Sequence, residues 1–196
     1  GGTAMSRYRS LAEDGPNEWY GLLARRRLVE LGVDFRPPAA APSPSTPVQM
    51  TLPEGVEFLV SIGLDEEAAD LLHTEEARFR GEGLAGIATL VDAYARLGDA
   101  ARSFRLARQG ASSASGGDPA LHAYFVRAMH PRPYADVVEA LGPRLGVEAS
   151  YVYGTMRQES GFDPSAVSRV GAIGLLQLMP RTAARAAASV GLELEP

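Results

Sequence analysis

Apolar residues recur at helical spacing along most of this chain. Weaker stripes of this kind occupy residues 19–31, 56–60 and 68–72, between more polar positions. No comparable run alternates with period two, so the sequence predicts an all-α or mainly α fold. The strongest stripe follows the i, i+3, i+4, i+7 pattern of an amphipathic helix and consists of Leu84, Ile87, Leu90, Val91, Tyr94 and Leu97.

A short segment containing glycine recurs between the expected helices. Gly32, Gly63 and Gly98 are 31 and 35 residues apart, and an aspartate follows each within two positions. Glycine adopts the left-handed conformation that ends a helix, and aspartate caps the next one. A period of about 34 residues is typical of stacked helix pairs. We therefore expect residues 1–129 to form a helical solenoid, a superhelix of helix pairs. An ordinary helical bundle with Gly-Asp turns is the alternative.

Two segments interrupt the helical pattern and are expected to be loops. Residues 36–53 hold six of the fourteen prolines, and residues 110–118 read GASSASGGD. A proline-bracketed break at residues 130–133 then marks the expected start of a second domain over residues 130–196. The pattern in this domain predicts helices over 134–141, 148–160 and 182–190.

Composition excludes several classes of site. The 196-residue chain has no cysteine, which rules out disulfides, thiolate zinc sites and cysteine nucleophiles. Its net charge is −5 and no basic stripe is present, so nucleic acid is not an expected partner. No apolar run is long enough to cross a membrane. The histidines lack metal-ligand spacing and are read as ordinary surface or helix-end residues. The first residues do not read as a signal peptide, which leaves the compartment open.

The residues around Glu159 carry the candidate chemistry. The predicted helix 148–160 ends at Gly161, with Pro164 just beyond, so Glu159 occupies the last helical turn. The negative end of a helix disfavours an ionised carboxylate, and a cover of apolar side chains would disfavour it further. A carboxylic acid that stays protonated can act as a general acid. Taken alone, however, a glutamate at a helix end is usually a solvated surface residue.

The segment 156–183, MRQESGFDPSAVSRVGAIGLLQLMPRTA, changes that expectation. It resembles the soluble lytic transglycosylase family, whose hallmark is a Glu-Ser pair followed by Ser-x-x-Gly-Ala-x-Gly-Leu-Met-Gln-x-Met-Pro-x-Thr-Ala. Glu159-Ser160 and the string from Ser168 to Ala183 match it, with Leu176 in place of the usual Met. Upstream, residues 19–28 resemble an element of the family's α-superhelical domain. Residues 131–134 resemble the Pro-x-x-Tyr start of its lysozyme-like catalytic domain.

The resemblance implies an activity and a set of site residues. The family cleaves the β-1,4 bond between N-acetylmuramic acid and N-acetylglucosamine in peptidoglycan and leaves 1,6-anhydromuramoyl ends. It implies that Glu159 is the single catalytic acid and base, assisted by the substrate's 2-acetamido group. It also implies that Ser168, Gln177 and Met179 bind the substrate. Peptidoglycan glycan strands would be the partner, no metal or cofactor would be needed, and the location would be the bacterial periplasm or cell envelope.

Several alternatives stay open at this point. Asp163 reads as a turn residue, but a position facing Glu159 would favour a muramidase hydrolase on the same fold. Ser160 lacks the surroundings of a hydrolase nucleophile. In the family, a further half of the catalytic domain carries an Ala-Tyr-Asn-Ala-Gly string that these residues do not contain. We therefore expect 130–196 to be the N-terminal part of that domain, with a second chain or segment as a candidate partner. A catalytically incomplete scaffold that binds peptidoglycan or a partner protein is the alternative function.

Overall fold

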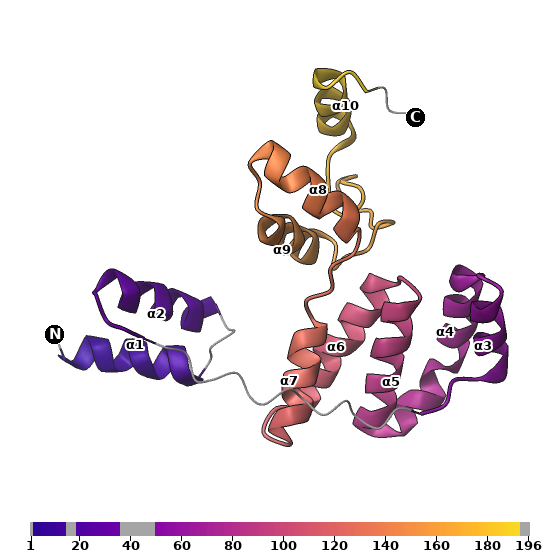
Figure 1. The fold of residues 1–196 in the computed structure, drawn as a ribbon, viewed down its shortest axis with the longest axis horizontal. Coiled ribbons are helices and arrows are strands. Elements are labelled where there is room, and N and C mark those ends of the chain that lie inside the picture. The colour runs from indigo at the N-terminus through magenta and orange to yellow at the C-terminus, as the bar shows by residue number, and fades with distance from the viewer. Residues whose placement is uncertain (1, 15–18, 36–49, 193–196) are drawn as a thin grey trace. The chain divides into compact units, whose positions relative to one another are not determined.

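The computed structural model describes residues 2–14, 19–35 and 50–192 (Figure 1). Within these residues there is no β-strand, only two isolated antiparallel bridges that both involve Ile173. The prediction of an all-α fold is therefore confirmed. The described residues form the helices α1 Gly2–Asp14, α2 Trp19–Glu30, α3 Glu54–Ser61, α4 Asp65–Gly81, α5 Gly83–Arg96, α6 Ala100–Ala114, α7 Pro119–Ala128, α8 Ala135–Leu145, α9 Ala149–Glu159 and α10 Pro180–Ser189.

The chain divides into two compact units, residues 1–44 and 45–196. In the first unit, α1 and α2 pack around a small core formed by Ala12, Ala24 and Leu28. The stripe predicted over 19–31 is only partly buried, since Leu22, Leu23, Val29 and Leu31 are exposed. Most of the predicted loop 36–53 lies outside the described residues, as does the side chain of Trp19. The predicted domain boundary after residue 129 stays a prediction.

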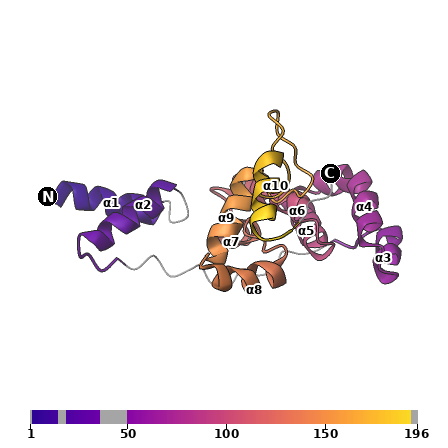
Figure 2. The same cartoon turned by 90° about the horizontal axis from the view of Figure 1, so that it is seen from above.

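In the second unit, α3 packs against α4, α4 against α5, α5 against α6 and α6 against α7. Figure 2 shows α3 and α4 at one end of this row, with α5 and α6 in the middle. The apolar stripe of α5 lies at the centre of the shared core, where Leu90 and Tyr94 have no exposed surface. Stacking of consecutive helices through apolar stripes is the arrangement expected of a helical solenoid.

The repeated glycines end helices as predicted. Gly32, Gly63 and Gly98 have positive φ angles of 71°, 78° and 78°. The predicted capping role holds for Asp99, whose carboxylate accepts a hydrogen bond of 2.8 Å from the Arg102 amide at the start of α6. It does not hold for the aspartate after Gly63, which begins α4 and makes no capping bond.

The predicted Gly/Ser loop 110–118 is wrong at its start, because α6 continues to Ala114 and only residues 115–118 remain outside helices. The reason is packing between helices. Gly110 is buried against the ring of Phe125 on α7, and any Cβ at this position would overlap that ring. This glycine therefore permits close approach of two helices, whereas the composition of the segment had favoured a flexible loop.

The C-terminal helices also differ slightly from the prediction. α8 extends beyond Leu141 and contains Pro143 in its last turn. The helix closes at Gly146, which has φ 67°, and the Val147 amide donates to the Gly142 carbonyl over 2.9 Å. α9 ends at Glu159, one residue before the predicted end of that helix. α10 begins at Pro180, two residues before its predicted start.

One half-buried carboxylate joins α4 to α5. Glu76 accepts hydrogen bonds from the Tyr94 hydroxyl at 2.9 Å and from Arg80 Nη2 at 3.0 Å, and its other close neighbour is His73 Nδ1 at 3.1 Å. Burial raises the pKa of Glu76, but the hydrogen bonds from His73, Arg80 and Tyr94 outweigh it and hold this pKa below its ordinary value. Burial also raises the pKa of Tyr94, which keeps its hydroxyl a donor.

We expect Glu76→Gln to lower the free energy of unfolding by about 1–2 kcal/mol at neutral pH, because the charged acceptor is lost. A lowered pKa in the folded state stabilises the protein above the unfolded-state pKa, and this contribution disappears as the pH falls through the folded-state pKa. Urea unfolding between about pH 6 and pH 3 should therefore show a weaker acid dependence in the variant. Glu75→Gln, which loses only a long ion pair of 3.9 Å to Arg78, is the control. An unchanged acid dependence in Glu76→Gln would contradict this assignment.

Candidate active site

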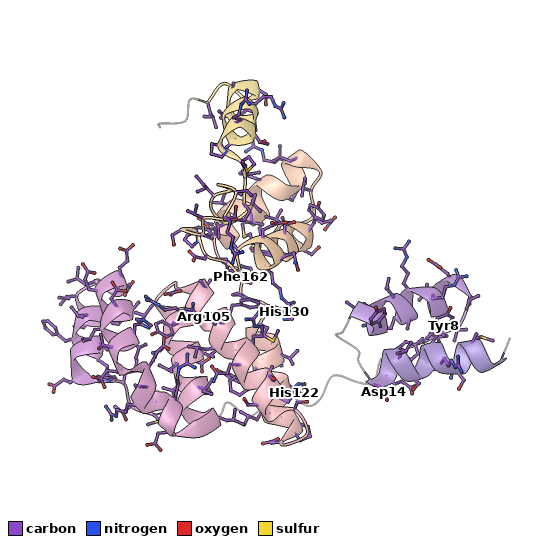
Figure 3. The ribbon with its side chains drawn as sticks, turned by 180° about the vertical axis from the view of Figure 1, so that it is seen from behind. Tyr8, Asp14, Arg105, His122, His130 and Phe162 are labelled. Atoms are coloured by element: carbon purple, nitrogen blue, oxygen red, sulfur yellow. The ribbon has the colours of Figure 1, made fainter. Side chains whose placement is uncertain are left out.

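Glu159 is the last residue of α9, and the chain turns sharply after it. Gly161 and Phe162 have positive φ angles of 61° and 70°. The left-handed conformation is unfavourable for a bulky aromatic residue, so burial must hold Phe162 there. Its ring is 3% exposed and packs edge-on against Phe104 of α6, with the ring centroids 5.3 Å apart. This contact fixes the end of α9 against α6, where Figure 3 labels Phe162 and Arg105.

The turn after α9 places Glu159 in a groove of about 510 Å³ between α9 and α6. The groove is mainly polar, and Phe104 is its one large apolar side chain among the lining residues. Glu159 itself is exposed. The apolar cover expected from the sequence is therefore not provided by the described residues. The full lining is Ala101, Phe104, Arg105, Arg108, Arg157, Gln158, Glu159, Ser160, Gly161 and Asp163.

Ser160 connects the glutamate to the loop that follows. Its hydroxyl oxygen lies 3.0 Å from the Met156 carbonyl on α9 and 3.0 Å from the Leu175 carbonyl in the loop. One hydroxyl proton is shared between these two acceptors, so Ser160 joins the helix end to a segment fifteen residues away. The sequence alone predicts no role for Ser160, although its place in the Glu-Ser pair is the available signal.

We expect Ser160→Ala to lower the free energy of unfolding by about 1 kcal/mol, because the connection between α9 and the loop is lost. Amide hydrogen exchange in residues 166–178 should become faster, since the loop loses an anchor. Ser150→Ala, at an exposed position of the same helix, is the matched control and should leave both measurements unchanged. Equal exchange rates in the two variants would show that the Ser160 hydroxyl does not hold the loop.

The predicted substrate residues Ser168 and Gln177 both hold the loop together. The Ser168 hydroxyl accepts a 2.9 Å hydrogen bond from the Ala172 amide. The side-chain amide of Gln177 donates to the carbonyls of Ala166 at 3.0 Å and Gly174 at 2.9 Å. Gln177 also adopts a left-handed conformation with φ 47°. Ser168 can still donate its hydroxyl proton, and Gln177 still has its carbonyl oxygen for an external group.

Met179 and Asp163 complete the predicted set. Met179 precedes α10 and is 43% exposed, so its thioether is available for contact with a ligand. Neither it nor the other two predicted substrate residues lines the groove that contains Glu159. Asp163 does line it, but its Oδ1 accepts bonds of 2.8 Å and 2.7 Å from the amide and hydroxyl of Ser165. This is the turn role that the sequence favoured for Asp163.

The described residues contain no group of three or more His, Asp or Glu side chains placed to hold a metal ion. No helix in the part of the chain that the structure describes has the length and hydropathy to cross a membrane.

Comparison with known proteins matches the C-terminal part of the chain to one family. Residues 136–195 match the family model of the transglycosylase SLT domain. Membrane-bound lytic murein transglycosylase C of Haemophilus ducreyi is 48% identical over 54 residues, which cover 28% of this chain and 15% of that protein. The protein of the same name from Haemophilus influenzae is 41% identical over an equally long segment of 54 residues.

Two solved structures share the fold over nearly the whole chain. The X-ray structure of an inactive Glu-to-Gln mutant of lytic transglycosylase Slt from Pseudomonas aeruginosa is 22% identical with a TM-score of 0.53 and covers 98% of this chain. The 70 kDa soluble lytic transglycosylase of Escherichia coli is 16% identical with a TM-score of 0.62 and covers all of it. This chain spans 29% of each of those two chains.

These comparisons confirm the resemblance found in the sequence. The segment 136–195 matches the transglycosylase SLT domain model, and the fold of the described residues is similar to that of the two soluble lytic transglycosylases. The chain spans only 15% of the length of the first of the murein transglycosylase relatives.

Proposed function

We propose that the protein carrying this chain is a peptidoglycan lytic transglycosylase with Glu159 as its catalytic acid and base. The observation that carries the proposal is the position of Glu159, which lies at the end of α9, in a groove, and within the segment matched to the transglycosylase SLT domain. The solved Slt protein in which a glutamate is replaced by glutamine is described as inactive, which supports a glutamate as the essential group in this fold.

The proposed reaction breaks the β-1,4 bond between N-acetylmuramic acid and N-acetylglucosamine. Glu159 donates its proton to the glycosidic oxygen, which leaves with the bonding electron pair on the N-acetylglucosamine side. The 2-acetamido oxygen of the muramic acid stabilises the electron-poor anomeric carbon. The Glu159 carboxylate then removes the proton of the C6 hydroxyl, and O6 bonds to the anomeric carbon. This step closes the 1,6-anhydro ring and returns Glu159 to its acid form without consuming water.

Because Glu159 is exposed, the bound substrate would have to supply part of the surroundings of its carboxyl. A sugar lying across the groove would exclude water from the reacting carboxyl. The remaining hydrogen-bonding capacity of Ser168 and Gln177 suits sugar hydroxyl and acetamido groups. The exposed thioether of Met179 suits the apolar face of a sugar ring. We assign substrate binding to these three residues on that basis.

Digestion of purified peptidoglycan sacculi tests the proposed function. The chain is incubated alone and together with a polypeptide that carries the Ala-Tyr-Asn-Ala-Gly segment expected in the family, and the products are separated by mass. Muropeptides with 1,6-anhydro ends support a lytic transglycosylase. Products with reducing ends indicate a muramidase hydrolase instead. Binding to sacculi without any product indicates a helical scaffold. The substrate and the homologous murein transglycosylases together favour a location in the periplasm or cell envelope.

A further inference from the structure

The side chain of Glu159 has no partner of its own. Within the described residues it makes no hydrogen bond and no ion pair, and it is exposed. No contact of the side chain therefore fixes the direction of the carboxyl. Because Glu159 is the last residue of α9, that direction depends on how firmly the end of the helix is held. The contacts that hold this helix end thus determine where the carboxyl lies.

One aromatic ring of α6 contacts the chain on both sides of Glu159. Two residues before it, the guanidinium carbon of Arg157 lies 5.6 Å from the centroid of the Phe104 ring. Three residues after it, Phe162 packs edge-on against the same ring, with the centroids 5.3 Å apart. A Cβ on Gly161, which lies between them, would stand 3.6 Å from two carbons of the Phe104 ring. A single side chain of α6 therefore supports the whole turn that carries Glu159.

The two rings contact protein on nearly all of their surface. Phe104 is 7% exposed and Phe162 is 3% exposed. They share a small buried cluster with Val138 and Met156, and Phe104 is the one of these four residues outside the matched segment 136–195. A ligand in the groove would meet little of either ring. Any effect of Phe104 on the reaction must therefore pass through the turn and not through direct contact with a sugar.

The turn that follows α9 needs such a support. Phe162 has a positive φ of 70°, and a bulky residue keeps this conformation only where its surroundings impose it. The helix end is closed by two hydrogen bonds, which the amides of Ser160 and Phe162 donate to the Met156 carbonyl over 3.1 Å and 3.3 Å. Without the Phe104 ring, Phe162 is free to return to an extended conformation. That change would break the second hydrogen bond and loosen the last turn of α9.

We propose that Phe104 is a positioning residue for the reaction, because its ring holds the end of α9 so that the Glu159 carboxyl reaches the glycosidic oxygen. In this arrangement α6 supports the active site, although it lies outside the segment 136–195. The inference rests on the proposed function, since it concerns how Glu159 is held for proton transfer. A proton donor must lie within hydrogen-bond reach of its acceptor, and a displacement of about 1 Å can lower a rate about 100-fold.

Steady-state cleavage of soluble peptidoglycan oligomers tests this role. The chain is combined with the polypeptide that carries the Ala-Tyr-Asn-Ala-Gly segment. We expect Phe104→Ala to lower kcat by about tenfold or more and to change KM by less than about twofold, because the carboxyl is displaced while the sugar contacts remain.

Leu106→Ala is the matched control on the same helix. Leu106 is 1% exposed and belongs to the larger core of α3 to α7, not to the Phe104 cluster. Its truncation lowers stability as the loss of any buried side chain does, but it should leave kcat unchanged. The comparison therefore separates positioning of Glu159 from a general loss of stability.

Amide hydrogen exchange measures the helix end without turnover. Exchange at the amides of Ser160 and Phe162 should become about tenfold faster in Phe104→Ala and stay unchanged in Leu106→Ala, because these amides exchange through local opening. Circular dichroism shows whether each variant is folded. If Phe104→Ala does not fold, Phe104→Leu takes its place, since leucine keeps most of the apolar volume, and the expected loss of kcat is then about threefold.

The outcomes separate this inference from the function on which it rests. A kcat equal to that of Leu106→Ala, or a loss that appears in KM alone, would overturn the positioning role and leave Glu159 catalysis standing. Unchanged exchange at Ser160 and Phe162 would also overturn it, because the ring would then not hold the helix end. Absence of anhydro products from the unmodified chain in the same assay would instead count against the proposed function.

Discussion

Replacing Glu159 with Gln is expected to lower the rate of anhydromuropeptide release by about 10³-fold or more, because in the proposed mechanism the same carboxyl acts first as acid and then as base. A glutamine side chain has nearly the same size and can still accept and donate hydrogen bonds, but it cannot transfer a proton in either step. Binding of glycan should change little, since the charge of the acid form is also zero. Product release from sacculi, followed by mass spectrometry, measures the effect.

The control for this variant lies at the opposite end of α9, immediately before its first residue. The Glu148 carboxylate is exposed and makes no capping hydrogen bond to α9. The Glu148→Gln variant should therefore release anhydromuropeptides at the original rate. Anhydro products formed at an undiminished rate by the Glu159 variant would show that another group carries the proton. The muramidase alternative would then depend on Asp163, whose replacement by Asn should be tested next.

Gly86→Ala is expected to produce the largest loss of stability among the glycine substitutions, on the order of 3 kcal/mol. Gly86 lies in α5, and a Cβ there would overlap the carbonyl oxygen of Phe79 and stand 2.7 Å from its carbonyl carbon. The obstacle is backbone, which cannot rotate away as a side chain can, so α4 and α5 must separate. Since Phe79 is fully buried, that movement also disturbs the core. Urea unfolding followed by circular dichroism measures the change.

Gly81→Ala is the matched control, because a Cβ at Gly81 meets no heavy atom within 4 Å. Alanine is favoured over glycine in helices, so this variant should be as stable as the original or more stable by up to about 1 kcal/mol. Similar losses in the two variants would mean that the helix pair tolerates separation and that Gly86 is not a contact point.

Local sequence patterns predicted most of the helices because periodicity and helix ends depend on neighbouring residues. The stripe from Leu84 to Leu97 predicted α5 and its buried face, and Gly63 and Gly98 marked helix ends through their positive φ angles. The same local reasoning failed at Gly110, where composition favoured a loop. Gly110 contacts Phe125 on another helix, and a contact between residues far apart in the sequence cannot be predicted from a local pattern.

At the candidate site, too, some features could be predicted from the sequence and others depended on the tertiary structure. The ordered string from Glu159 to Ala183 was sufficient to indicate the catalytic candidate and the family model that the segment matches, since it depends on residue identity alone. The tertiary structure decided the surroundings of Glu159: an exposed carboxyl in a polar groove, with arginines contributed by α6 from far outside the matched segment. That groove exists because Phe104 and Phe162 pack against each other across 58 residues of chain. The sequence by itself determined most of the helices and the candidate residue Glu159, because both depend on local pattern and residue identity. Long-range packing decided which charged side chains lie beside Glu159, because those side chains come from a helix far away in the sequence.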